Sequence, residues 1–298
     1  MIKAPLLTRT KPMNKPSFTK SLLFFVLLSL FSISAFAQSS NLIKRTTYKT
    51  ETLDFSVGGT LSVAGAPNGS IRVEGWSKNE IEISAEIEIQ AATEADLNEI
   101  AKVTTYVLEE STARTGIISV GTHDKKFLKR LAKKFPKNLI GLPFKIDYVI
   151  KVPQYCDLQI DGGKGDLYIA GIEGAMKINF LESKAVINLV GGGIYATFGG
   201  GTVDINVPVR SWRGRFADIQ LAIGTMNISL PPGLNAEVDA TILRTGKIDN
   251  TYSEFKPKTR KDTFTEKLIT AKSGVGGVPL KFTVGDGTIN IFAMKKPN

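Results

Sequence analysis

Between residues 152 and 230, short apolar runs alternate with glycine-rich turns about every nine residues, and this spacing limits the folds open to the chain. The runs are Leu158–Ile160, Leu167–Ile169, Met176–Phe180, Val186–Val190, Ile194–Phe198 and Val203–Val207. One such repeat cannot bury its inward side chains, whereas stacked repeats share a continuous core. The stretch therefore predicts a mainly β chain built as a parallel β-helix, or β-solenoid, with a right-handed coil. Asn179, Asn188 and Asn206 are of a type that can form ladders inside such coils.

The preceding part of the chain is also β-rich but carries two helix signals. Residues 81–89 alternate apolar and polar side chains, the pattern of a half-buried strand. Short helices are predicted near 93–103, where Thr93 can cap the first turn, and near 125–135. We expect a flexible lead-in over 38–50, a β-rich part over 51–150, and solenoid repeats over 151–298 that continue the same domain.

The first 37 residues have the composition of a signal peptide. Residues 1–20 are basic, residues 21–37 are apolar and serine-containing, and Ala35-Phe36-Ala37 fits the cleavage pattern. We expect cleavage near Ala37 and Gln38, and therefore a periplasmic, outer-surface or secreted protein. Cleavage removes five basic residues, which leaves 33 basic against 28 acidic residues and a net charge of +5. This charge is too small to indicate a nucleic-acid partner.

Residues 125–137 combine an apolar stripe with many basic side chains. Phe127, Leu128, Leu131 and Phe135 fall on one face of a helix. One interpretation is a solvated lid whose apolar stripe covers the open end or the flank of the solenoid. The alternative is contact with an anionic membrane surface, which attracts basic amphipathic helices. The candidate contact residues are Lys125, Lys126, Lys129, Arg130, Lys133, Lys134 and Lys137.

A second candidate surface is a predicted loop that interrupts the repeats at residues 211–217. It carries one aromatic and two basic side chains, which suit a ligand-binding loop: Trp212, Arg213 and Arg215. A polar stretch at 250–267 is expected to be another extruded loop.

The composition argues against an enzyme. His123 is the only histidine, so histidine-based metal sites and hydrolytic triads lack parts. Cys156 is the only cysteine and starts a predicted strand, as a small buried residue would. The acidic residues of the repeats are scattered beside turns. We expect no catalytic residue, cofactor or metal, and a glycan-active β-helical enzyme is the weaker alternative.

Several segments carry a family resemblance. They are similar to the bacterial "putative adhesin" domain family of unknown function. The segments are Asn68–Ile81 (which begins Asn68-Gly69-Ser70-Ile71-Arg72-Val73-Glu74-Gly75-Trp76), the Val152-Pro153 step into the repeats, Leu243–Asn250 (with Arg244-Thr245-Gly246-Lys247-Ile248) and Gly285-Asp286-Gly287-Thr288-Ile289-Asn290-Ile291. The resemblance covers about residues 50–292 and consists of turn glycines and strand starts. It implies an exported β-helical protein and supplies no catalytic residues.

Three functional classes follow, in order of preference. The first is a non-enzymatic adhesin or cell-envelope binding module. The second is a peripheral membrane or envelope-signalling module that uses residues 125–137. The third is the glycan-active enzyme. The partner classes are an envelope glycan, an anionic lipid surface or another surface protein.

Overall fold

The computed structural model describes residues 42–298 except residues 112, 132–134, 208–212, 262 and 295–298. The predicted signal peptide therefore lies outside the described residues. Within the described part, no helix is long and apolar enough to cross a membrane.

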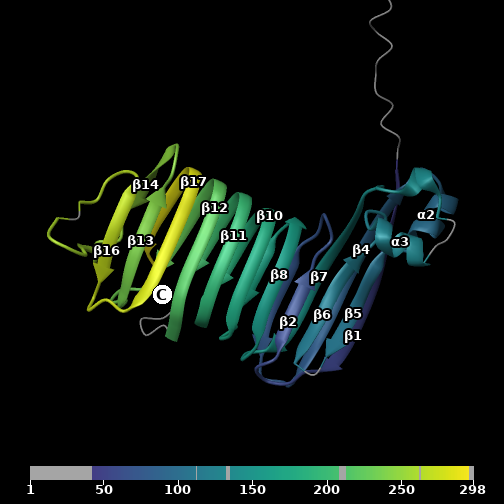
Figure 1. The fold of residues 1–298 in the computed structure, drawn as a ribbon, viewed down its shortest axis with the longest axis horizontal. Coiled ribbons are helices and arrows are strands. Elements are labelled where there is room, and N and C mark those ends of the chain that lie inside the picture. Colours follow the sequence, from purple (N-terminus) through teal and green to yellow (C-terminus); the bar gives the residue numbers. More distant parts are fainter. Residues whose placement is uncertain (1–41, 112, 132–134, 208–212, 262, 295–298) are drawn as a thin grey trace, which may run out of the picture. The chain divides into compact units, whose positions relative to one another are not determined.

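The chain is mainly β, as predicted, and its strands form one large mixed sheet (Figure 1). The strands are β1 (Ile43–Asp54), β2 (Thr60–Ala64), β3 (Ile71–Trp76), β4 (Glu80–Ala91), β5 (Thr105–Ser111), β6 (Arg114–Val120), β7 (Phe144–Pro153), β8 (Asp157–Lys164), β9 (Leu167–Ala170), β10 (Ala175–Asn188), β11 (Gly191–Asn206), β12 (Arg213–Leu230), β13 (Ala236–Ile242), β14 (Gly246–Asn250), β15 (Lys256–Pro257), β16 (Leu268–Ser273) and β17 (Val278–Ala293). The helices are α2 (Glu94–Ala101), α3 (Lys125–Leu131) and the 3-10 turn η2 (Lys137–Leu139).

The long strands of the repeat region pair in parallel and in register. Met176 on β10 lies opposite Ile194 on β11, Ile194 lies opposite Ala217 on β12, and Ala217 lies opposite Leu280 on β17. All four side chains are buried. Because side chains alternate between the two faces of a strand, this register stacks the buried apolar positions of neighbouring strands on one another.

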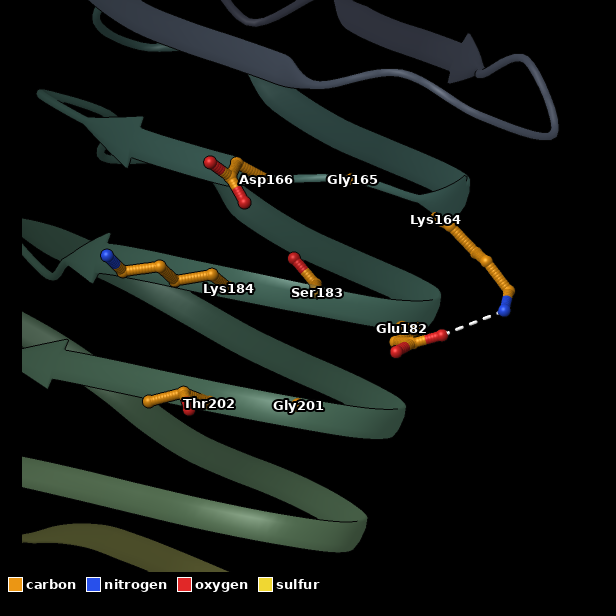
Figure 2. A pocket seen from close by; sticks show the side chains of 8 residues that line it. All are labelled: Lys164, Gly165, Asp166, Glu182, Ser183, Lys184, Gly201 and Thr202. Carbon is orange, nitrogen blue, oxygen red and sulfur yellow. Dashed lines mark ion pairs between the residues drawn. The ribbon is translucent and has the colours of Figure 1, made fainter.

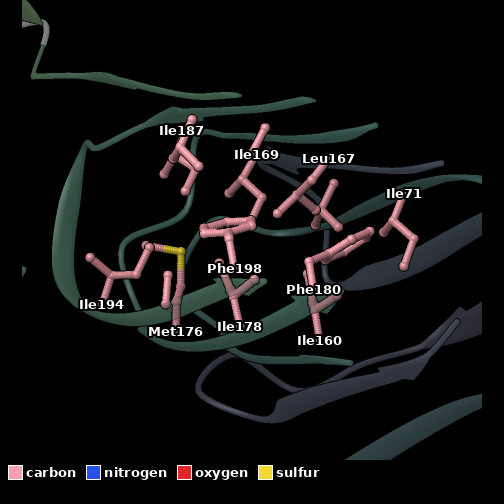
Figure 3. Close-up of a cluster of buried hydrophobic side chains, with 14 of the residues drawn as sticks. Ile71, Ile160, Leu167, Ile169, Met176, Ile178, Phe180, Ile187, Ile194 and Phe198 are labelled. Atoms are coloured by element: carbon pink, nitrogen blue, oxygen red, sulfur yellow. The ribbon is translucent and has the colours of Figure 1, made fainter. Parts of the chain in front are cut away.

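The repeats share an apolar core (Figure 3). Phe180 and Phe198 stack in this core with ring centroids 6.5 Å apart. Each of these side chains is buried, and burial of one large apolar side chain contributes roughly 1.5–3 kcal/mol. The repeats are therefore stabilised mainly by contacts between neighbouring strands.

The N-terminal strands pair in a more varied way. β4 lies between β1 and β7 in antiparallel pairs, and β5 and β6 form an antiparallel hairpin. β2 and β3 pair in parallel with β8 and β9, which connects this region to the repeats. Thr93 caps α2 by accepting a hydrogen bond from the Asp96 backbone N–H, and Leu97 and Ile100 bury the apolar side of the helix.

Three sequence-based expectations need correction. The lead-in predicted over 38–50 is wrong for residues 43–50, which belong to β1 because the exposed edge of β4 offers them a partner. Arg213 and Arg215 lie in β12 and not in a loop, because this segment pairs with the start of β11. The asparagine ladders lie on the outward face, where half-buried Asn188 and Asn206 alternate with buried apolar neighbours.

Candidate functional site

One corner of the repeats is formed by a column of small residues. Gly201, Gly224 and Gly287 lie opposite one another and have φ values of 115°, 142° and 143°. A side chain at Gly224 would place its Cβ 1.9 Å from the Gly201 carbonyl oxygen. Ser183 occupies the same position on β10, opposite Gly201. No non-glycine residue of the described chain has a positive φ, so Ser183 passes this corner in an ordinary strand conformation.

A groove of about 530 Å³ opens beside Ser183 (Figure 2). Three of the residues that line it, Gly165, Ser183 and Gly201, lie at this corner, and Ser183 is the one that is not glycine. Three consecutive corner segments line it with polar side chains and bare backbone. They contribute Lys164, Gly165, Asp166, Glu182, Ser183, Lys184, Gly201 and Thr202. Segments that are 18 residues apart in sequence therefore meet at one place.

The side chains of the groove have unused hydrogen-bonding capacity. Lys164 and Glu182 form an ion pair of 2.9 Å at the outer edge. Asp166 and Lys184 have no side-chain partner within the described chain. Ser183 is only 4% exposed, and its hydroxyl has no hydrogen-bond partner among the described residues. In Figure 2 this hydroxyl is directed toward the segment that carries Asp166. A buried hydroxyl without a partner costs free energy, which a ligand hydrogen bond would recover.

The groove continues into rows of polar side chains on the outward face of the strands. Thr202 lies opposite Thr225, and Thr225 lies opposite Thr288. A second row lies two residues further along each strand, and side-chain hydrogen bonds connect its members. Asn227 Nδ2 donates to Asp204 Oδ1 at 2.7 Å, and Asn290 Nδ2 donates to Asn227 Oδ1 at 2.7 Å. The register of the core thus fixes a regular array of hydroxyl and amide groups.

The site has the means to bind polar ligands but lacks a catalytic arrangement. Ser183 has no base in hydrogen-bond contact among the described residues, and a serine nucleophile needs one. His123 lies elsewhere, stacked on Phe144 with centroids 5.1 Å apart, and desolvation there lowers its pKa. Burial raises the pKa of the Cys156 thiol to about 12, which keeps it protonated and unreactive. No group of three metal-ligating side chains occurs in the described part of the chain.

The predicted basic helix is shorter than expected. α3 ends at Leu131, η2 begins at Lys137, and Lys133 and Lys134 lie outside the described residues. Asp124, which the sequence reading overlooked, caps α3 by accepting hydrogen bonds from the backbone N–H groups of residues 126 and 127. Its side chain takes up helix donors that would otherwise be unsatisfied.

The two faces of α3 have different surroundings. Phe127 and Leu128 are buried, at 8% and 4% exposure, so the apolar stripe packs on the protein. The basic side chains are exposed and have no ion pair in the described part: Lys125, Lys126, Lys129 and Arg130. Lys137, in η2, is also exposed. The packing favours the interpretation of this segment as a lid, and contact of its charges with a membrane stays a prediction.

The second predicted surface is only partly described. Arg213 and Arg215 are exposed at the start of β12, where Arg213 lies opposite Gly191, while Trp212 lies outside the described residues. The structure does not bring these arginines into the groove. The groove itself was missed because the repeats were counted at about nine residues. A period of 18 aligns Gly165, Ser183 and Gly201, and would have marked Ser183 as the exception.

Comparison with known proteins gives structural similarity alone. No family model matches the chain, and no curated protein matches its sequence. A "putative cell adhesion protein" from Clostridium sporogenes aligns with a TM-score of 0.46 at 12% identity, covering 84% of this chain and 100% of that one. A "putative adhesin" from Bacteroides fragilis aligns with a TM-score of 0.32 at 13% identity, covering 83% of this chain and 97% of that one. A "putative lipid binding protein" from Parabacteroides distasonis aligns with a TM-score of 0.26 at 12% identity, covering 83% of this chain and 97% of that one.

Proposed function

We propose that the chain is an exported, non-enzymatic β-solenoid that binds a hydroxyl-rich glycan of the cell envelope along its outward face. The basic and apolar composition of residues 1–37 supports export. The parallel register of β10, β11, β12 and β17 supports a solenoid, since each strand adds one layer to the same core. The sequence resemblance to the "putative adhesin" family supports an adhesive role.

The main support for a glycan ligand is that the groove is continuous with the row of Thr202, Thr225 and Thr288. Thr202 belongs to both, and Thr225 and Thr288 extend the row across two further strands. Neighbouring strands lie about 4.8 Å apart, so the row offers an equivalent hydroxyl at each layer. A polymer with regularly spaced hydroxyl groups can use such an array. Because the backbone beneath it is held by the core, little ordering entropy is lost on binding.

The charges near the groove favour a glycan over a strongly charged polymer. Lys184 and Asp166 are of opposite sign, and Lys164 and Glu182 already neutralise each other. Hydroxyl groups both donate and accept hydrogen bonds, so they can satisfy an ammonium, a carboxylate and a serine hydroxyl together.

The test is binding of the purified protein to immobilised polysaccharides, measured by biolayer interferometry. Dextran and xylan serve as neutral probes, and alginate and hyaluronan as acidic probes. We expect at least one neutral polysaccharide to bind, and Thr225→Val together with Lys184→Ala to weaken binding about tenfold through loss of two hydrogen bonds.

Thr197→Val is the matched control, because Thr197 is an exposed outward threonine of β11 on the other side of the corner. The control should bind as the unaltered protein does. Failure of every polysaccharide to bind, or equal loss in the control, would contradict the assignment of the glycan site to this face.

A further inference from the structure

The hairpin of β5 and β6 carries apolar side chains on a face that the core does not cover. Val107 lies opposite Ile118, and both are only half-buried. Opposite residues of an antiparallel pair project from the same face of the sheet. The other face of the hairpin supplies Tyr106 and Ile117 to the core, where both are buried. The Val107–Ile118 pair therefore faces away from the core.

A pocket of about 600 Å³ lies over this pair, of a size that suits a small ligand. Val107, Ile118 and the buried Val120 are among its lining residues, with Phe127 and Arg130 contributed by α3. α3 thus has two roles in the structure: it buries its own apolar stripe, and it contributes one apolar and one basic side chain to the lining of this pocket.

The charged groups around the pocket differ in whether they already have an ion-pair or hydrogen-bond partner. The Lys102 ammonium pairs with Glu99 at 2.6 Å, and Asp124 accepts two backbone hydrogen bonds as the cap of α3. Among the described residues, the side chains of Arg130 and Glu109 have no partner. Within the described part of the chain, the pocket therefore offers the unpaired guanidinium of Arg130 next to an apolar floor, while Glu109 disfavours a ligand with several negative charges.

We propose that this pocket binds one monomeric anionic amphiphile, with its acyl chain against Val107, Ile118 and Phe127 and its single anionic head paired with Arg130. Charge complementarity selects the head, because a guanidinium binds carboxylate and similar anions strongly. The apolar atoms are recessed beside a helix whose own stripe is buried, so a flat bilayer is a poorer fit than a single chain. The proposal is independent of the glycan site.

The test is isothermal titration of the purified protein with dodecanoate below its micellar concentration, with dodecyltrimethylammonium as the cationic probe of equal chain length. We expect dodecanoate to bind at one site and the cationic probe to bind more weakly. Arg130→Gln should weaken dodecanoate about tenfold while leaving the cationic probe unaffected or improved. Val107→Gln should weaken both probes, since it removes apolar contact from the floor.

Two matched controls separate the pocket from general effects. Val149→Gln changes an outward valine of β7 that is 43% exposed, and Lys125→Gln removes a charge of α3 that does not line the pocket. Both should bind dodecanoate as the unaltered protein does, and thermal unfolding confirms that each variant folds. The proposal would be overturned if the Val107→Gln and Arg130→Gln variants bound dodecanoate as tightly as the unaltered protein does. The proposal would also be overturned if the protein bound phosphatidylglycerol vesicles more tightly than dodecanoate and if Lys125→Gln weakened this binding as much as Arg130→Gln. That result would assign the basic side chains of α3 to a membrane surface.

Discussion

The repeat strands β10, β11, β12 and β17 and the N-terminal strands β1–β7 use the same alternation of apolar and polar residues in different ways. In the repeats, the pairing is parallel and in register, and the turn column continues from strand to strand. In the N-terminal part, antiparallel pairs such as β4–β7 and β5–β6 are mixed with parallel pairs such as β2–β6 and β3–β7, and helices follow β4 and β6.

This difference explains why the two candidate sites have opposite chemistry. A repeated register gives repeated outward rows, so the repeats present hydroxyl and amide groups such as Thr225 and Asn227 in a regular array. At the antiparallel hairpin of β5 and β6, an outward apolar pair, Val107 and Ile118, remains beside α3. The regular strands present an extended polar face, whereas the hairpin beside α3 lines an open pocket with an apolar floor and charged side chains around it.

Among substitutions that test this difference, we expect the largest effect in the glycine column formed by Gly201, Gly224 and Gly287. Gly224→Ala should lower the free energy of unfolding by about 3 kcal/mol, because the new Cβ would lie 1.9 Å from the Gly201 oxygen in a positive-φ conformation. Gly58→Ala, at φ 81° in open space near β2, should cost only about 1 kcal/mol. Denaturant unfolding measures both.

Gly200→Ala is the control for the column. Its Cβ would meet nothing closer than the Ile223 oxygen at 3.7 Å, so we expect a change within about 0.5 kcal/mol. Equal costs for Gly224 and Gly200 would show that the close approach of Gly224 to the Gly201 oxygen does not exclude a side chain at this corner.

A smaller effect is expected from the amide ladder. Asn227→Ala removes one hydrogen bond to Asp204 and one from Asn290 in a half-buried row, at a cost of about 1–2 kcal/mol. Asn179→Ala removes a single exposed hydrogen bond to Asp161, and should cost a few tenths of a kcal/mol at about the level of other surface changes. If urea unfolding gives equal losses, the ladder adds nothing beyond isolated surface pairs.

The smallest effect concerns acid sensitivity. The hydrogen bond from Arg244 to Asp286, 2.9 Å long, lowers the pKa of the Asp286 carboxyl. The pKa of Asp286 is therefore lower in the folded protein than in the unfolded chain. The Arg244–Asp286 contact contributes to stability above the ordinary aspartate pKa of about 4, and this contribution is lost as pH falls through the folded pKa. In the N-terminal part, a hydrogen bond from Gln90 likewise lowers the pKa of Glu88.

NMR titration of the Asp286 carboxyl carbon measures this shift directly. Arg244→Gln should return the Asp286 pKa toward its ordinary value and leave Glu88 unchanged, since the two carboxyls have different partners. A shift of both would mean that the two regions respond as one electrostatic unit.

The sequence by itself determined the mainly β class and the two short helices, because periodicity and caps such as Thr93 act between near neighbours. It also showed that residues 125–131 are amphipathic. It left open whether their apolar stripe faces protein or membrane.

Only the tertiary structure decided which residues meet. Pairing of Ser183 with Gly201, of Asp204 with Asn227 and of Asn227 with Asn290 joins residues 18, 23 and 63 apart. Such pairs follow from the register, and the register is set by burial of the whole core and not by any local preference. The same holds for β1, whose polar sequence predicts no strand until the edge of β4 supplies its partner.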